Sequence, residues 1–251
     1  MLIPPVDSLG KDDVIISPRR GKNERPLPRS GVLLVNPKEA AYGHTLVREK
    51  GGEMRNIPHT KLSVSVSGKL FVAGPAVSSP IAALIAEKLI VLGAERLYAL
   101  SWCGSVSPEL LIGDTVIGGL PLSGEGTSRY YTADVEPAPS VLLSRRLEQY
   151  AAQLGFDPVI GRIWSTDAPY RESRSFLRNI YLEKQIYGVD MEYSALCAVC
   201  AFRKIEFASL FLVSDELWGE KWKPGFNNKG FQEKNSVLTR ALVAEEWAVY
   251  D

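Results

Sequence analysis

The sequence predicts a single α/β domain of three layers, in which helices cover both faces of a central sheet. The chain has 251 residues, of which 45% are hydrophobic, so it can bury a large core in one domain. Short apolar runs of strand type alternate with helical segments along most of the chain. No internal repeat and no linker divides this alternation. The pattern therefore favours one layered domain over two separate ones.

Residues 1–30 differ from the rest of the chain, because five prolines lie there among many charged residues. Proline fixes φ and removes a backbone donor, so such a segment is predicted to be irregular. We therefore expect an irregular N-terminal arm over residues 1–30 and the α/β domain over residues 31–251. The arm is either a loosely packed terminus or a segment that lies over a neighbouring subunit.

Cap and turn signals divide the domain into its expected elements. Ser79 and Pro80 mark the start of a helix that ends at Gly93. The predicted strands cover residues 32–35, 62–66, 70–73, 97–100, 115–117, 159–164 and 207–213. A loop through Gly104 and Pro108 is expected after the fourth of these strands. The predicted helices cover residues 79–92, 140–154, 191–202 and 232–250.

Charge and hydropathy exclude several classes of protein. Lysine plus arginine and aspartate plus glutamate each total 29, so the net charge is zero and no field attracts nucleic acid or an anionic membrane. The longest apolar segment, residues 81–92, contains Glu87 and Lys88 and is not expected to span a bilayer. No stretch of signal-peptide type is found near the N-terminus. Three cysteines cannot all pair with one another, so we expect a soluble cytoplasmic protein.

Two acidic side chains, Glu192 and Asp215, stand close to the ends of short apolar runs. Buried strand ends are where α/β folds place binding and catalytic groups. We therefore predict that both carboxyl groups belong to one functional site.

The sequence offers few residues for a metal site or for histidine-based catalysis. The chain has only two histidines. Cys197 and Cys200 have the spacing of half a zinc site, but no second pair of cysteines or histidines accompanies them. We therefore expect neither a metal ion nor a histidine-based catalytic triad.

Three motifs lie in order along the chain: Leu-Tyr-Ala-Leu-Ser-Trp-Cys-Gly-Ser at residues 97–105, Gly-Val-Asp-Met-Glu at residues 188–192, and Ser-Asp at residues 214–215. They resemble the motifs of the nucleoside phosphorylase family, which contains purine nucleoside phosphorylases, uridine phosphorylases and methylthioadenosine/adenosylhomocysteine nucleosidases. The resemblance covers roughly residues 31–218. It implies a mixed, barrel-like central sheet flanked by helices, and a homo-oligomer, dimer or hexamer, with sites at subunit interfaces.

The resemblance assigns roles to the two acidic residues. Glu192 would accept hydrogen bonds from ribose hydroxyls, and Met191 would pack on the sugar. The alternative for Glu192 is an exposed acid in the first turn of a helix, where the helix dipole favours it. Asp215, beside Ser214, would be the general acid or hydrogen-bond partner of the base. The alternative for Asp215 is a helix or turn cap.

Other site residues follow from the same resemblance. Trp102, Cys103 and Gly104 of the first motif are expected at the substrate. Residues 164–172 occupy the region in which the family recognises the base. There, Trp164 or Tyr170 would stack on the nucleobase, while Arg171 and Glu172 would read its edge. A solvated loop is the alternative interpretation of this segment.

The phosphate-binding positions depart from the family pattern. Where the family has Gly-Asp-Pro followed by arginine, residues 35–39 read Val-Asn-Pro-Lys-Glu, so Glu39 replaces the arginine. A second arginine position is Ala99, and a serine position is Trp102. A phosphate dianion needs cations and donors, which these three side chains do not supply. The nucleosidase branch has a glutamate at the position of Glu39, where it activates water. Glu39 is therefore either a general base or a surface acid in a first helical turn.

The resemblance implies cleavage of the N-glycosidic bond of a purine or pyrimidine nucleoside. Phosphorolysis would use phosphate as a co-substrate, hydrolysis would use water, and no other cofactor is expected. The expected partner is a nucleoside or nucleobase, with no nucleic acid and no membrane. The alternative is a non-catalytic nucleoside-binding or sensing module that kept the ribose pocket and lost the nucleophile site.

Overall fold

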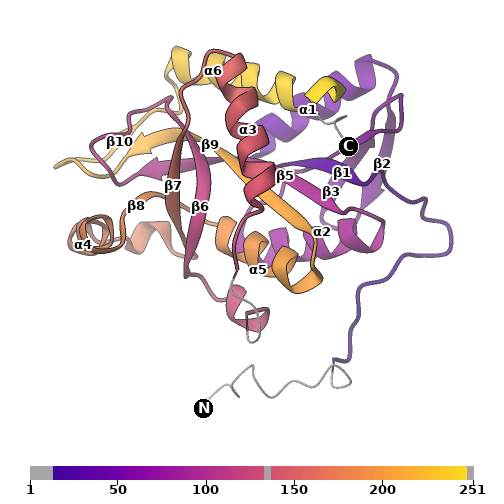
Figure 1. The fold of residues 1–251 in the computed structure, drawn as a ribbon, viewed down its shortest axis with the longest axis horizontal. Helices are drawn as coiled ribbons and strands as arrows, with labels where there is room; N and C mark the ends of the chain where they lie inside the picture. Colours follow the sequence, from indigo (N-terminus) through magenta and orange to yellow (C-terminus); the bar gives the residue numbers. More distant parts are fainter. Residues whose placement is uncertain (1–13, 133–136, 248–251) are drawn as a thin grey trace.

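The computed structural model describes residues 14–132 and 137–247. Within these ranges the strands form one sheet of ten, with helices on both faces (Figure 1). The strands are β1 (Ser30–Leu34), β2 (Glu53–Ile57), β3 (Thr60–Val64), β4 (Leu70–Gly74), β5 (Arg96–Ser105), β6 (Thr115–Gly124), β7 (Val159–Thr166), β8 (Ile186–Asp190), β9 (Glu206–Glu216) and β10 (Lys223–Pro224). The helices are α1 (Pro37–Glu49), α2 (Ser79–Val91), α3 (Val141–Gln153), α4 (Arg174–Lys184), α5 (Tyr193–Arg203) and α6 (Lys229–Leu242).

Half of the sheet closes on itself. The strand order is β10-β9-β6-β7-β8-β5-β1-β4-β3-β2, and β9 also pairs with β5. The strands β5, β9, β6, β7 and β8 therefore form a closed barrel, while β1, β4, β3 and β2 extend the sheet from β5. Pairings are mixed, because β5 is parallel to β9 but antiparallel to β8. The predicted mixed, barrel-like sheet is confirmed.

Helices on both faces give the predicted three layers. Leu33 of β1 belongs to the core cluster that contains the apolar side chains of α2 and α5. Its neighbours Val32 and Leu34 belong to a second cluster, with side chains of α1, α3 and α6. Successive strand residues point to opposite faces, so the two groups of helices lie on opposite sides of the sheet (Figure 1).

Local cap signals gave several helix ends correctly. Pro80 lies in the first turn of α2, and Gly93 follows the helix with a φ of +119°. The side-chain oxygen of Ser140 accepts a hydrogen bond from the Leu143 backbone N–H and caps α3. The predictions of helices over residues 79–92 and 140–154 are confirmed to within two residues at either end.

Several predicted boundaries are wrong. The strand predicted over residues 115–117 continues as β6 to Gly124. Gly104 does not lie in a loop, because β5 continues to Ser105, where β8 and β9 pair with it on both sides. The last helix does not extend over residues 232–250, since α6 begins at Lys229 and ends at Leu242. Beyond it, the Trp247 indole N–H donates to the Leu242 carbonyl at 2.9 Å, so the chain turns back there. Residues 248–250 of that prediction lie outside the described residues.

Residues 1–13 of the predicted arm lie outside the described ranges. Residues 14–29 of the arm are described and contain neither helix nor strand. Ile15 is 98% exposed, whereas Leu27 is buried and its N–H donates to the Leu92 carbonyl at 2.8 Å. The arm also contacts α2, because Lys88 Nζ donates to the Arg19 carbonyl oxygen at 3.1 Å and lies 2.6 Å from Glu24 Oε2. Across residues 14–132 and 137–247, none of the helices has the length and hydropathy to cross a membrane.

Gly31→Ala is expected to destabilise the protein by roughly 1–3 kcal/mol, because it overpacks the core. A Cβ at Gly31 would lie 2.1 Å from the ring of Phe71, its fully buried partner on β4. Denaturant unfolding measures the loss. Gly126→Ala is the control, since its Cβ would make an ordinary contact at 3.6 Å. Equal stability of both variants would contradict the prediction.

Candidate active site

A cavity of about 610 Å³ opens where β5, β8 and β9 meet. Its walls come from Trp102, Cys103 and Gly104 of β5, from the end of β8, and from the end of β9. The loops before α4 and α6, the loops after β1 and β4, and the first residues of α4 complete it. Concave sites at the ends of sheet strands are common ligand sites in α/β proteins.

A β-bulge sets the direction of the β9 side chains at this cavity. Cys103 pairs with Val213 and Gly104 pairs with Asp215, so Ser214 is an extra residue on β9. A bulge of this kind bends a strand and redirects the side chains that follow. Ser214 Oγ lies 2.7 Å from Asp215 Oδ1 and 3.2 Å from the Cys103 carbonyl oxygen. The bulge therefore places Ser214 and Asp215 together on the cavity wall.

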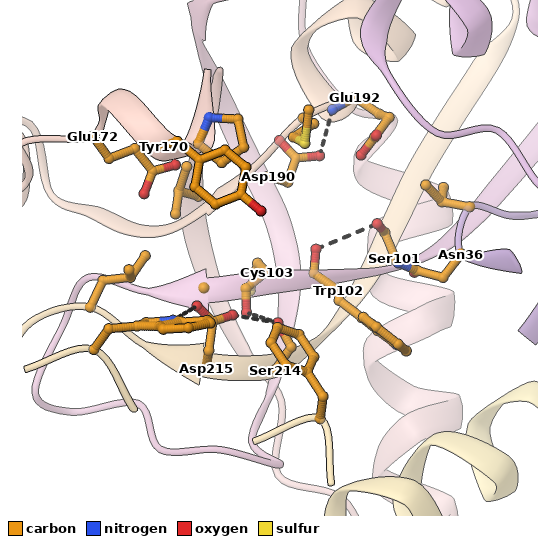
Figure 2. A pocket seen from close by; sticks show the side chains of 18 of the residues that line it. Asn36, Ser101, Trp102, Cys103, Tyr170, Glu172, Asp190, Glu192, Ser214 and Asp215 are labelled. Carbon is orange, nitrogen blue, oxygen red and sulfur yellow. Dashed lines mark hydrogen bonds between the residues drawn. The ribbon is translucent and has the colours of Figure 1, made fainter. Parts of the chain in front are cut away.

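Asp190 and Glu192, the first acidic pair, lie together on one side of the cavity (Figure 2). Asp190 Oδ1 accepts a hydrogen bond from Ser165 Oγ at 2.5 Å. Its Oδ2 accepts from the backbone N–H groups of Glu192 at 3.1 Å and Tyr193 at 2.7 Å, at the start of α5. Asp190 thus fixes the backbone that carries Glu192.

Glu192 is only 5% exposed, and its Oε1 accepts a hydrogen bond from the Ser78 backbone N–H at 2.7 Å. Ser78 has a φ of +83°, an unusual conformation for a residue other than glycine. Burial raises the pKa of Glu192, and the neighbouring Asp190 carboxylate raises it further. Burial also raises the pKa of Asp190, although three hydrogen bonds to the carboxylate act in the opposite direction.

Glu172 and Asp215 form the second acidic pair, and both line the cavity (Figure 2). Asp215 Oδ2 accepts a hydrogen bond from the Trp222 indole N–H at 2.7 Å, and Ser214 contacts its other oxygen. Burial, together with the negative charge of Asp215, raises the pKa of Glu172 to about 7. Glu172 can therefore change its protonation state close to neutral pH.

Glu172→Gln is expected to change how the free energy of unfolding depends on pH. The folded pKa of about 7 lies above the ordinary value of 4.5, so the folded state holds this proton more tightly than the unfolded chain. The contribution of Glu172 to stability therefore falls as pH rises from 4.5 to about 7, and stays low above that window. The variant lacks this fall and should gain roughly 1–2 kcal/mol over wild type across the window, allowing for solvent screening. Denaturant unfolding at both ends of the window measures the gain, and a gain of equal size at both ends would contradict the assignment.

The structure brings most of the predicted site residues to the cavity. These are Trp102, Cys103, Gly104, Tyr170, Met191, Glu192, Ser214 and Asp215. Trp164 and Arg171 are not on its wall. Trp164 is buried and packs edge-to-face on Phe176, with ring centroids 4.9 Å apart, while Arg171 is exposed to solvent.

Glu39 also lies off the cavity wall and is buried at the start of α1 rather than exposed. Its Oε1 accepts a hydrogen bond from Asn235 Nδ2 of α6, and its Oε2 is buried without a partner among the described residues. Trp102, which does line the cavity, donates from its indole N–H to Asn235 Oδ1 at 3.4 Å. Burial raises the pKa of Glu39. Hydrogen bonds from Trp102 to Asn235 and from Asn235 to Glu39 thus connect the cavity wall to the protein interior.

Sequence reasoning missed several contacts of the site. The backbone N–H of Ser78 points to Glu192 because Ser78 has a positive φ, and no local sequence motif predicts that φ. Asn235 stands 196 residues after Glu39, its partner. Trp222 is different, because residues 218–226 read from the sequence either as a cover over the pocket or as a plain surface loop, and Trp222 and Phe226 line the cavity.

The cavity is rich in acids and poor in cations. Among the described residues that line it, four carry carboxyl groups and only Arg174 carries a positive charge. The Arg174 guanidinium donates to the Glu220 carbonyl oxygen. Within residues 14–132 and 137–247, no cluster of three metal-ligating side chains occurs.

A cavity lined by acidic side chains at the strand ends of a closed α/β barrel is the kind of concave site at which α/β proteins commonly bind small molecules. The chain belongs to the phosphorylase superfamily, whose family model matches residues 33–245. That family contains nucleoside phosphorylases and nucleosidases, and the family predicted from the three motifs is confirmed.

Similar proteins support this membership at low identity. DeoD-type purine nucleoside phosphorylase of Brevibacillus brevis is 26% identical over 180 residues, which cover 70% of this chain and 76% of that protein. Uridine phosphorylase of Vibrio fischeri has a TM-score of 0.73 at 19% identity, covering 86% of this chain and 91% of that one. AMP nucleosidase of Bacteroides thetaiotaomicron has a TM-score of 0.66 at 21% identity, covering 84% and 87%. The two structures show a shared fold.

Proposed function

We propose that this chain binds a nucleoside in the cavity and cleaves its N-glycosidic bond by hydrolysis. The similar proteins are named as purine nucleoside and uridine phosphorylases and as an AMP nucleosidase. The observation that favours water over phosphate is the scarcity of cations at the cavity. Arg174 is the one cation among the described lining residues, and its guanidinium donates to the Glu220 carbonyl oxygen, so a phosphate dianion would find few charged donors.

In this proposal the two acidic pairs hold opposite ends of the nucleoside. Cleavage develops positive charge on the sugar, as in other glycosyl transfers. Glu192, fixed by Ser78 and by the backbone that Asp190 holds, would accept hydrogen bonds from ribose hydroxyls and stabilise that charge. Asp215 and Glu172 would contact the base. Because the sugar becomes cationic only as the bond breaks, the first pair would stabilise the transition state more than the bound substrate.

Met191 and the β5 residues would provide the remaining contacts. Met191 lines the cavity next to Glu192 and would pack on the sugar. Tyr170, which is fully exposed at the cavity wall, would stack on the base. The backbone of Cys103 and Gly104 would form the floor, since a Cβ at Gly104 would come within 3.3 Å of Asp215 Oδ2.

The test is a nucleoside panel of purines and pyrimidines, incubated with and without phosphate. Free base, ribose and ribose 1-phosphate are then quantified. Base and ribose released in phosphate-free buffer support hydrolysis. Release of base that requires phosphate and yields ribose 1-phosphate would overturn the proposal of hydrolysis. The same panel decides between purine and pyrimidine.

Glu39→Gln is expected to keep at least half of the hydrolytic rate, because Glu39 lies off the cavity wall and contacts Asn235 instead. The glutamine can still accept the hydrogen bond from Asn235. Loss of about 100-fold or more in kcat would be the size expected of a general base and would assign Glu39 the water-activating role. The rates of both proteins are compared at several pH values.

One observation favours a second candidate, a non-catalytic nucleoside-binding module. The predicted water activator, Glu39, has no contact with the cavity, and both oxygens of Asp215 already have hydrogen-bonding neighbours. Such a module would bind nucleosides in calorimetry and release no base in the panel.

A further inference from the structure

The carboxyl groups of Glu172 and Asp215 line one cavity, but their hydrogen-bonding surroundings differ (Figure 2). Asp215 Oδ2 accepts the Trp222 indole N–H at 2.7 Å, and an indole nitrogen can only donate. Asp215 Oδ1 lies 2.7 Å from Ser214 Oγ. A proton on Oδ1 would be shared with Ser214, and a proton on Oδ2 would displace Trp222. Asp215 is therefore placed to accept hydrogen bonds and not to offer a proton to the cavity.

The carboxyl group of Glu172 has no such partners. No hydrogen bond within the described part of the chain stabilises its charged form. Glu172 follows the short 3₁₀ helix Pro169–Arg171, and its backbone N–H donates to the Pro169 carbonyl oxygen at 3.4 Å. The next residue, Ser173, caps α4 by accepting from the Phe176 backbone N–H at 3.2 Å. The backbone is thus held on both sides, while the carboxyl group is free to contact a ligand.

These surroundings decide which of the two groups holds a proton. Two neighbouring carboxyl groups resist ionising together, so one of them keeps its proton. Ser214 and Trp222 contact the oxygens of Asp215, so the charge belongs on Asp215 and the proton on Glu172. The raised pKa of Glu172, caused first by burial and then by the charge of Asp215, agrees with this division. Surroundings that separate the protonation states of two carboxyl groups are typical of an acid and its partner in catalysis.

We propose that Glu172, and not Asp215, is the general acid that protonates the departing base. The inference rests on the proposed nucleoside cleavage. As the bond between C1′ and the base nitrogen breaks, its electron pair moves to the base, and the Glu172 O–H proton passes to a nitrogen or oxygen atom of the base. Water forms the new bond to C1′ and loses one proton to solvent, from which the Glu172 carboxylate is protonated again. Nucleoside and water thus give ribose and a neutral base.

The first test compares leaving groups. Inosine, adenosine and uridine release a base that needs a proton, whereas p-nitrophenyl β-D-ribofuranoside releases a phenolate that is stable without one. Glu172→Gln should lower kcat for the nucleosides by about 100-fold or more, the size expected of a general acid, and should change kcat for the phenolate-releasing substrate by less than about threefold. A purely structural role would lower both rates equally.

Asp215→Asn is the matched variant, because its amide can keep both contacts. The amide oxygen can accept from Trp222, and the amide nitrogen can donate to Ser214 Oγ. We expect kcat for the nucleosides to fall by less than about tenfold, the size of one ordinary hydrogen bond. Glu183→Gln is the control, since Glu183 is exposed near the end of α4 and does not line the cavity. It should keep the wild-type rates with every substrate.

The pH dependence of the nucleoside rate is the second test. The charged or titratable groups that share the cavity with Glu172 are Cys103, Tyr170, Arg174, Asp190, Glu192 and Asp215. Loss of the Glu172 proton lowers the rate at high pH, whereas Asp190 and Glu192 act as carboxylates, so their ionisation raises it. Wild type should therefore give a bell-shaped profile, and Glu172→Gln a rate that rises and then stays level. In Asp215→Asn the maximum should move to lower pH, because the charge of Asp215 no longer raises the pKa of Glu172.

The outcomes separate this proposal from that of hydrolysis. A nucleoside rate unchanged in Glu172→Gln, an equal loss with all substrates, or an alkaline fall that persists in this variant overturns the acid role and leaves hydrolysis standing. A loss confined to the nucleosides in Asp215→Asn would make Asp215 the acid. If cleavage requires phosphate, hydrolysis is overturned, and the same comparison with phosphate decides the acid role, since protonation of the base does not depend on the acceptor. Cleavage of no nucleoside under either condition overturns both proposals.

Discussion

Glu192→Gln is expected to lower kcat/KM for nucleoside cleavage by about 10- to 100-fold, which corresponds to a lost charge-assisted hydrogen bond of about 1.5–3 kcal/mol. The glutamine amide can still accept the Ser78 N–H through its oxygen, so the local backbone should not change. What is lost is a carboxyl group that can ionise opposite the sugar, so the loss should grow as pH rises, because the pKa of Glu192 is raised. Because the carboxylate charge acts mainly as the sugar becomes cationic, the loss should appear in kcat.

The same substitution should not reduce stability. Burial and Asp190 raise the pKa of Glu192, so ionised Glu192 is unfavourable in the folded protein. A neutral glutamine removes that cost, and Tm should stay equal or rise. Steady-state kinetics and thermal unfolding are measured on the same preparation. Full activity in the variant would remove Glu192 from the reaction, and a large drop in Tm would show that the activity loss comes from misfolding.

Asp190→Ala is expected to act in the opposite way and to destabilise the protein by roughly 2–4 kcal/mol, since buried donors would lose their acceptor. Asp190 accepts from Ser165 Oγ and from the backbone N–H groups of Glu192 and Tyr193. Without it, the start of α5 has no side-chain acceptor from β8. Activity should also fall, because Glu192 would no longer be fixed.

Denaturant unfolding compares Asp190→Ala with Asp190→Asn, whose oxygen can still accept from one side. We expect the asparagine variant to be intermediate in stability. Ser165→Ala removes one of the three hydrogen bonds and should cost less than Asp190→Ala. An Asp190→Ala protein as stable as wild type would show that these hydrogen bonds contribute little.

The sequence predicted those parts of the fold whose signals are local. Pro80 and Gly93 bracket α2, and Ser140 caps α3, because cap chemistry depends on neighbours within a few residues. The end of β5 could not be predicted this way. Gly104 is typical of a loop, yet β8 and β9 pair with it on both sides, and such pairing involves residues about one hundred positions away.

The same distinction applies to the site. Glu192 and Asp215 were predicted to belong to one site because they follow buried strands, and both line one cavity. For Glu39 and Trp164, the motif gave a position along the chain but not the direction of the side chain. Asn235 holds Glu39, and Phe176 packs on Trp164. These partners come from α6 and α4, so only the folded chain shows them.

Gly104 has a residue of β8 on one flank and a residue of β9 on the other, Val189 and Asp215. The separation between Asp190, which follows Val189, and Asp215 is thus set by the pairing of β8 and β9 with one strand, β5. A fixed separation of these two carboxyl groups selects ligands by length, so sugar–base units that are too long or too short should bind poorly whatever their charge. An adjustment at that glycine would shift both flanks at once.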